Sequence, residues 1–200
     1  MTSVITGDII NSRNVDNQIW LTSLKKIFKE VDAGEIFRGD SFQIEIKNAS
    51  EAFFTAIKIK SYIKAIKGVD VRMAIGIGEK NFSSDTIVES NGEAFINSGK
   101  AFDALLKKQT LAVKSPWKEF DEEINLAIRL SLLTMDNWTQ NSAEFVRTLL
   151  NNLSSTQIEI SKKLNISQSS TSERRKRAGL DEILQLEKRY RKLITKKSET

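Results

Sequence analysis

The chain has 200 residues, of which 40% are hydrophobic and 28% are charged, which suits one medium domain or two small ones. It contains no cysteine and no histidine, which excludes disulfides, zinc sites built on these residues and Ser-His-Asp hydrolysis. Any chemistry must therefore use carboxylates, amines, hydroxyls, backbone groups or a hard metal ion bound through oxygen. The first residues lack the basic region of a signal peptide, and no segment approaches the roughly 20 apolar residues of a membrane span. We therefore expect a cytoplasmic protein with no membrane partner.

Positive charge is concentrated near the C-terminus. Residues 162–197 contain 12 Lys and Arg against 4 Asp and Glu, whereas residues 1–161 contain 19 against 21. A basic segment on a near-neutral body is typical of a protein that contacts a polyanion such as double-stranded DNA. The alternative is a solvated basic helical face with no nucleic-acid partner.

The single proline, Pro116, marks a change of pattern. Strand-like and helix-like segments alternate before it, and every segment after it has helical spacing of its apolar residues. We expect a first domain over residues 1–115, linker helices over 116–152 and a terminal helical domain over 153–200.

The first half predicts an α+β fold. Its elements in chain order are a strand at 3–10, a helix at 19–31, a hairpin at 35–46, a helix at 49–67, a strand at 69–78, a helix at 93–107 and an edge strand at 111–113. Arg38, Gly39 and Asp40 form the hairpin turn. Gly76 and Gly78 predict a close backbone approach or a bulge. This order matches the ferredoxin-like, split βαβ arrangement, in which the first strand lies beside the hairpin.

Two aspartates stand where that arrangement would bring them together. Asp8 ends the apolar part of the first strand, and Asp40 lies in the hairpin turn. Adjacent carboxylates repel each other unless a cation or a proton joins them, and Mg²⁺ or Mn²⁺ is the cation that suits oxygen ligands. The backbone amides of residues 10–12 would face an anion at a helix start. The alternative is that Asp8 caps the next helix and Asp40 only makes the turn.

Four segments in this order resemble the SatD family of bacterial proteins: GDIINSR at 7–13, RGDSFQ at 38–43, VRMAIGIG at 71–78 and GEAFINSGKA at 92–101. More distantly, residues 3–113 resemble the palm domain shared by class III nucleotide cyclases and diguanylate cyclases. In those cyclases, one aspartate at the end of the first strand and another in a Gly-Asp hairpin hold two metal ions over a nucleoside triphosphate. The resemblance places Asp8 and Asp40 at these two metal-binding positions.

The cyclase resemblance also implies a nucleotide site. The residues after Asp8 match the backbone that cradles the phosphates. The cyclases carry an asparagine and an arginine on the helix after the glycine motif, whereas this chain has Asn97 and Lys100 at a shifted spacing, and lysine lacks the bidentate fork of arginine. The nucleotide-binding residues implied in this way are Ile10, Asn11, Ser12, Arg13, Asn97 and Lys100.

The second half begins with two predicted linker helices, at 122–135 and 143–150, and continues with a segment at 154–179 that resembles the helix-turn-helix of bacterial regulators. Ile160 would anchor its first helix, Asn165 would take the left-handed conformation of the turn, and Ser167 would cap the second helix. Thr171 and Arg175 stand where this motif normally buries aliphatic side chains.

The resemblance to a helix-turn-helix implies DNA contacts from the second helix. Its first turns would face the bases and its last turn would meet phosphates. The expected DNA-binding residues are Gln168, Ser169, Ser170, Ser172, Arg174, Lys176 and Arg177. The alternative is a helical hairpin used for dimerisation, and apolar residues of the linker helices would also suit the seam of a homodimer.

Three functions fit these observations. We favour a DNA-binding transcriptional regulator with a cyclase-like palm domain that senses a nucleotide or a metal ion. The alternative is a metal-dependent nucleotidyl cyclase, or a related phosphoryl-transfer enzyme, with an accessory helix-turn-helix. The third is an interaction module in which the palm only dimerises.

Overall fold

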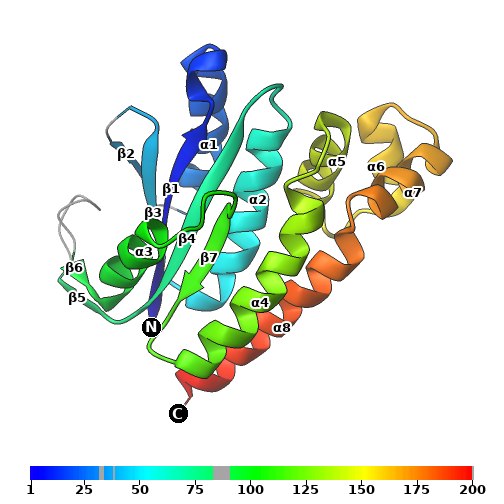
Figure 1. Cartoon of the computed structure of the whole chain (residues 1–200). Helices are drawn as coiled ribbons and strands as arrows, with labels where there is room; N and C mark the ends of the chain where they lie inside the picture. Colours follow the sequence, from blue (N-terminus) through cyan, green and yellow to red (C-terminus); the bar gives the residue numbers. More distant parts are fainter. Residues whose placement is uncertain (32–33, 38, 83–90, 200) are drawn as a thin grey trace.

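The computed structural model describes residues 1–31, 34–37, 39–82 and 91–199 (Figure 1). Its main sheet has five strands in the order β2-β3-β1-β4-β7. β1 is antiparallel to both β3 and β4, and β7 is parallel to β4. A separate two-stranded ribbon joins β5 and β6. The strands are β1 (Thr2–Ile10), β2 (Glu35–Phe37), β3 (Ser41–Ile46), β4 (Asp70–Gly78), β5 (Lys80–Phe82), β6 (Asn91–Gly92) and β7 (Leu111–Lys114).

Eight α-helices and two short 3₁₀ turns lie within the described residues. The helices are α1 (Asn17–Val31), α2 (Ala52–Lys64), α3 (Glu93–Asp103), α4 (Lys118–Met135), α5 (Gln140–Leu150), α6 (Gln157–Leu164), α7 (Gln168–Arg177) and α8 (Leu180–Ser198), and the 3₁₀ turns are η1 (Ser12–Asn14) and η2 (Ala49–Glu51). The mixed α+β composition and the predicted order of elements are confirmed; the β5–β6 ribbon was not predicted. None of these helices combines the length and the hydrophobicity needed to cross a membrane.

The two faces of the sheet are covered by different helices (Figure 1). Successive side chains of a strand point to opposite faces. On β4, Met73 and Ile75 therefore join the hydrophobic core beneath α1 and α2, while Arg72 and Gly76 point to the face on which α3 lies. The face under α1 and α2 is thus the apolar one, and the α3 face carries the polar residues.

Gly76 allows α3 to lie directly on β4. A Cβ atom at this position would stand 2.1 Å from both the carbonyl oxygen of Ala94 and the amide nitrogen of Ser98. The strand keeps a regular register with β1 through this point. The predicted close backbone approach is therefore confirmed, without a bulge. Of the predicted hairpin turn, Gly39 has a left-handed φ of 87°, as such a turn requires, while Arg38 lies outside the described residues.

Of the C-terminal helices, α5 and α8 pack on α2 and continue its hydrophobic core, while α4 packs beside β7 and α8. Tyr190 of α8 is fully buried, with its ring 5.6 Å from that of Phe53 and 5.9 Å from that of Phe120. Its hydroxyl group donates to the carbonyl oxygen of Ala49 at 3.0 Å. Burial raises the pKa of the Tyr190 hydroxyl well above its ordinary value. α8 is therefore anchored in the α/β half of the molecule.

A buried lysine joins four elements beneath the sheet. The ammonium group of Lys60 on α2 has no exposed surface and lies 3.1 Å from Asp70 of β4 and 2.6 Å from Asp136, the residue after α4. It also donates to the hydroxyl of Thr110, just before β7, at 3.1 Å. Two carboxylates and a hydroxyl offset the desolvation cost of this charge. The cluster therefore fixes the end of α4 against the α/β half.

Candidate functional site

The end of β1 brings the two predicted metal-binding aspartates to the same edge of the sheet. Asp8 lies directly opposite Ser41 of β3 in the antiparallel register, and directly opposite residues are about 4.5–5.5 Å apart between Cα atoms. The amide of Ile9 donates to the carbonyl oxygen of Asp40 at 3.2 Å. Asp8 and Asp40 therefore lie at neighbouring strand ends although 31 residues separate them in the sequence.

Asp8 forms an ion pair with the side chain of Arg72. Arg72, its register partner on β4, donates from Nε to Oδ1 at 3.1 Å and from a terminal nitrogen to Oδ2 at 2.5 Å. The guanidinium also lies over the ring of Phe102 on α3, 5.1 Å from its centroid. The hydrogen bond to Asp8 raises the pKa of Arg72. Both carboxylate oxygens of Asp8 thus have a charged partner, which sequence reasoning missed because it depends on the β1–β4 register.

Asp40 has a different partner. Its Oδ2 accepts a hydrogen bond of 2.5 Å from the hydroxyl of Ser12, which is itself buried. Ser12 begins the short turn after β1, and the preceding Asn11 has a left-handed φ of 59°. The turn therefore directs a serine hydroxyl at the hairpin carboxylate and closes this end of the sheet.

The side-chain oxygens of Asp8, Ser12 and Asp40 are suitable ligands for a divalent cation, but Arg72 already binds one of the two carboxylates. Carboxylate and hydroxyl oxygens are ligands that Mg²⁺ and Mn²⁺ accept. Arg72 donates to both oxygens of Asp8, however, so an ion at Asp8 would compete with the guanidinium for this carboxylate. Within the described residues, no group of three or more acidic side chains gathers as a ready-made metal site. The metal site remains a prediction.

The structure separates the predicted nucleotide-binding residues into two groups. Ile10 and Asn11 line a hollow of ≈ 410 Å³ at the end of β1, together with Lys64 at the end of α2 and Lys67 of the α2–β4 connection. Ser12, bonded to Asp40, and Arg13, which is exposed, lie in the same turn. These four residues therefore follow one another at the end of β1, and only Ser12 bonds to one of the two aspartates.

The other two predicted residues lie on α3. Asn97 is buried and donates to the carbonyl oxygen of Ile77 at 2.8 Å, so it fixes α3 against β4. Lys100 is exposed and lines a cavity on a different side of α3 from the one that meets β4. The structure thus does not bring Asn97 and Lys100 to the Asp8 edge.

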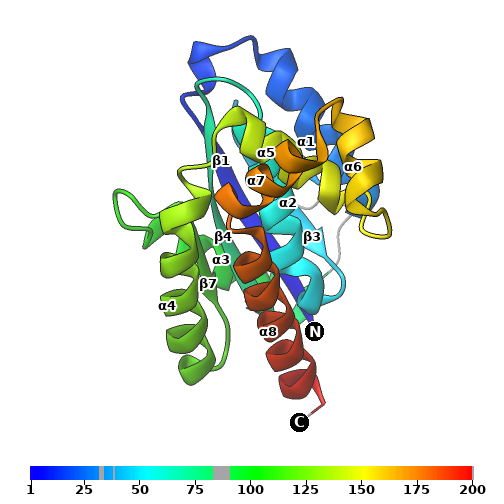
Figure 2. The same cartoon turned by 90° about the vertical axis from the view of Figure 1, so that its right-hand side faces the viewer.

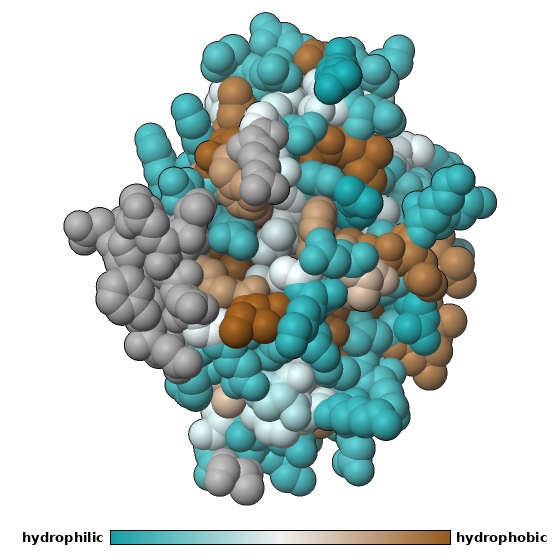
Figure 3. Space-filling view, turned by 60° about the vertical axis from the view of Figure 1, so that its left-hand side comes forward, coloured by the Kyte–Doolittle hydropathy of each residue, from teal (hydrophilic) through white to brown (hydrophobic). Residues whose placement is uncertain are grey.

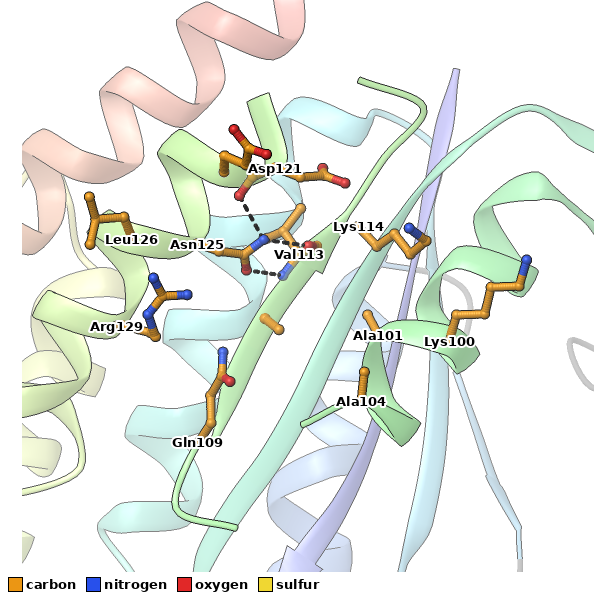
Figure 4. Close-up of a pocket in the computed structure, with 12 residues that line it drawn as sticks. Lys100, Ala101, Ala104, Gln109, Val113, Lys114, Asp121, Asn125, Leu126 and Arg129 are labelled. Atoms are coloured by element: carbon orange, nitrogen blue, oxygen red, sulfur yellow. Dashed lines mark hydrogen bonds between the residues drawn. The ribbon is translucent and has the colours of Figure 1, made fainter. Parts of the chain in front are cut away.

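The cavity beside Lys100 has a volume of ≈ 750 Å³ and lies between α3, β7 and α4 (Figure 4). Lys100 and Lys114 lie on its α3 side, and Arg129 and Gln109 lie on the opposite side. Asn125 of α4 closes the wall by bonding both backbone groups of Val113, at 2.8 Å and 2.7 Å. Its size is that of a small-molecule pocket.

The same wall contains a half-buried acid. Asp121 accepts from the amide and the hydroxyl of Ser115, at 3.1 Å and 2.6 Å, and desolvation raises its pKa above the ordinary value. Sequence reasoning missed this cavity because its walls come from elements on both sides of Pro116, and no local spacing signals that α4 packs beside β7.

In the helix pair α6–α7, the predicted conformation of Asn165 and the predicted cap at Ser167 are confirmed. Asn165 ends α6 in the left-handed region, with φ 51°, and the hydroxyl of Ser167 accepts from the amide of Ser170 to cap α7. Thr171 is buried and bonds back to the carbonyl oxygen of Ser167 at 3.0 Å. Arg175 turns to α8, where it pairs with Asp181 at 2.5 Å.

Most of the predicted DNA-binding residues lie on the outer face of α7. Arg174 is half-buried and points to Glu144 of α5 at 3.7 Å. Ser170 is also half-buried, beside the capping Ser167. The exposed members are Gln168, Ser169, Ser172, Lys176 and Arg177.

The family model of SatD matches residues 3–194, which include all of the main sheet except Thr2, the helices α1 to α7 and most of α8. No curated protein sequence matches the chain. Because the match covers nearly the full length, the chain belongs to the SatD family.

Proposed function

We propose that this protein is a DNA-binding transcriptional regulator whose α/β half senses a nucleotide or a metal ion. The observation that carries the proposal is the exposed polar and basic outer face of α7 in a helix pair whose turn is built on Asn165 and Ser167. Such a pair is the usual unit by which bacterial regulators enter the major groove. The last turn of α7 is entirely basic.

In this proposal α7 acts as the recognition helix. Gln168, Ser169 and Ser172 in its first turns would read base edges, while Lys176 and Arg177 would contact phosphates. The exposed Lys162 and Lys163 on α6 would add phosphate contacts beside them. Because each phosphate contact releases counterions, the affinity would fall steeply with salt concentration.

The sensing half rests on the strand arrangement and on the Asp8 edge. The order β2-β3-β1-β4, with each strand antiparallel to its neighbour, agrees with a ferredoxin-like palm, and β7 extends it at one edge. Phosphates of a nucleotide would meet the turn after β1, near Asn11 and Lys67. A divalent ion between Asp8 and Asp40 would free the Arg72 guanidinium to bind the same phosphates.

The DNA-binding half is tested by fluorescence anisotropy with labelled genomic duplexes over a series of salt concentrations. The variant Lys176→Ala/Arg177→Ala should bind every sequence more weakly, and its log–log salt slope should be smaller by about 2. The matched control, Lys188→Ala/Lys192→Ala, removes the same charge from the exposed side of α8 and should retain the wild-type slope. Absence of binding by the wild type at low salt, or equal losses in both variants, would contradict the proposal.

The sensing half is tested by thermal unfolding with each nucleoside triphosphate and Mg²⁺ or Mn²⁺. A ligand that binds only the folded state raises its stability, by about 2.7 kcal/mol at one hundred times its Kd. We expect a stabilisation of the wild type that Asp40→Asn removes. No stabilisation with any nucleotide would instead favour a palm that only mediates contacts.

The neighbouring positions of Asp8 and Asp40 also favour the second candidate function, a metal-dependent nucleotidyl cyclase or related phosphoryl-transfer enzyme. Incubation of each triphosphate with Mn²⁺ tests it. Product that the wild type forms and Asp40→Asn does not would support the enzyme, and equal or no product from both would exclude it.

A further inference from the structure

α4 carries a row of leucines that face the solvent. Leu126, Leu130 and Leu133 expose 54%, 61% and 71% of their surface, while Ile124 and Ile128 on the inner side are buried. Their spacing of four and three residues places them on one line along the helix. Figure 3 shows a face of the molecule on which hydrophilic side chains predominate and hydrophobic ones are exposed in separate patches. Single exposed leucines are ordinary, but a line at this spacing is the pattern of a helix seam.

Two hollows that share Arg129 and Gln109 lie beside this leucine row. The ≈ 750 Å³ cavity is lined by Leu126 and Arg129, and a second hollow of ≈ 310 Å³ is lined by Arg129, Leu133 and the 68% exposed Leu106. Leu130 lines neither hollow and projects from α4 into the solvent. A patch that carries both a projection and hollows can be complementary to a second copy of itself across a two-fold axis.

The charges at the two ends of the leucine row select one orientation for such a pair. Glu119 and Glu122 are exposed at the N-terminal end of α4, with Glu122 3.7 Å from Lys118. Lys107 and Lys108 are exposed near the C-terminal end, where Lys108 lines the hollow that also contains Leu133. Two antiparallel copies of α4 would place the acidic end of each opposite the basic end of the other. A parallel pair would place like charges together.

We propose that α4 is the surface through which two copies of this chain associate, with the helices antiparallel and Leu130 of each packed against Leu126 and Leu133 of the other. Figure 2 shows α4 and α6 on opposite sides of the molecule. The inference does not rest on the proposed function, because the leucine row and its charges are independent of α7. A single-helix seam is at the small end of specific interfaces, so the dimer should dissociate on dilution.

Sedimentation equilibrium of the full chain at several concentrations tests the proposal, with circular dichroism to verify the fold of each variant. The wild type should be a monomer–dimer system. Leu130→Lys should raise the dissociation constant by about tenfold or more, because burial of one leucine is worth roughly 1.5–3 kcal/mol. The matched control is Leu153→Lys, which alters an equally exposed leucine (62%) after α5 and should dimerise like the wild type.

A charge exchange tests the orientation. Glu119→Lys and Lys108→Glu should each weaken the dimer, and the double variant should recover it, because the exchanged charges again face each other. A wild type that stays monomeric at all concentrations, or a dimer that Leu130→Lys leaves intact, would overturn the proposal. The measurement contains no DNA and no nucleotide, so its outcome is separate from that of the proposed function.

Discussion

At the scale of single residues, Gly76 determines how near α3 can come to the sheet. A side chain at this position would collide with backbone atoms, the carbonyl oxygen of Ala94 and the amide of Ser98, which cannot rotate away. We expect Gly76→Ala to displace α3 and to lower the free energy of unfolding by about 3 kcal/mol, at the upper end of overpacking costs. Urea denaturation followed by circular dichroism measures this change.

Gly99 provides the control, since it lies within α3 and a Cβ atom there would meet nothing within 4 Å. Gly99→Ala should raise the free energy of unfolding by about 0.5–1 kcal/mol, because alanine loses less conformational entropy in a helix. Equal denaturation midpoints for the two variants would mean that α3 is not held at the distance described.

The sequence predicts the position of Asp8 but not its partner, Arg72. The positions of Asp8 and Asp40 in their strand and turn predict that they share a sheet edge, and the register places them at neighbouring strand ends. That Arg72 neutralises Asp8 follows only from the pairing of β1 with β4, which no local spacing encodes. The partner of a charged side chain on a strand can be identified only when the residues beside it on the neighbouring strands are known.

At the scale of elements, the spacing of hydrophobic residues predicts where the helices and strands lie more accurately than it predicts which of their faces are buried. The segment at 122–135 reads as one broad apolar face, but only one side of α4 is buried, with Ile128, while Leu130 projects into solvent. Lys60 shows the opposite case, a lysine in a helical pattern that is fully buried because two aspartates from other elements surround it. The propensities of the residues and the period of the hydrophobic pattern predict whether a segment is a helix or a strand. Which of its faces is buried depends on the elements that pack against it.

The junction of α7 and α8 should depend on pH in a defined direction. The hydrogen bonds from Arg175 hold the pKa of Asp181 below its ordinary value of 3.8. A carboxyl group with a lowered folded-state pKa stabilises the fold above its unfolded-state pKa, and this stabilisation is lost as the pH falls through the folded-state pKa. The pair is largely exposed, so we expect Asp181→Asn to lower the free energy of unfolding at neutral pH by at most about 1 kcal/mol.

The difference between Asp181→Asn and the wild type should shrink as the pH falls below 3.8 and disappear below the lowered pKa. Chemical denaturation across this pH range measures it. Glu182→Gln is the control, because Glu182 has the same charge in the same first turn of α8 but is not bonded to Arg175. A loss that is constant with pH, or one shared equally by the control, would show that the Arg175 contact contributes nothing.

At the scale of the whole molecule, the chain shares one hydrophobic core across the change of pattern at Pro116. α8 inserts Tyr190 between Phe53 and Phe120, and Trp138 donates to the carbonyl oxygen of Ala178 at 2.9 Å. The change of pattern after residue 115 was visible in the sequence, whereas the contacts between the two sides were not, because they join residues up to 141 positions apart. Contacts of this range are the ones that local patterns cannot encode.

Because α8 and the sheet share one hydrophobic core, a substitution that weakens the packing of α8 should also destabilise the sheet. Tyr190→Ala removes a fully buried ring and should lower the free energy of unfolding by about 3–5 kcal/mol. Amide hydrogen exchange in β1, at the buried Ile5, should report the same loss as exchange in α8, because one cooperative unit opens as a whole. Tyr190→Phe keeps the ring, loses only the bond to Ala49, and should cost about 0.5–1.5 kcal/mol at both places. If Tyr190→Ala accelerates exchange in α8 while Ile5 keeps its protection, the helices and the sheet unfold separately, and a ligand bound at the Asp8 edge would then have no shared core through which to affect α7.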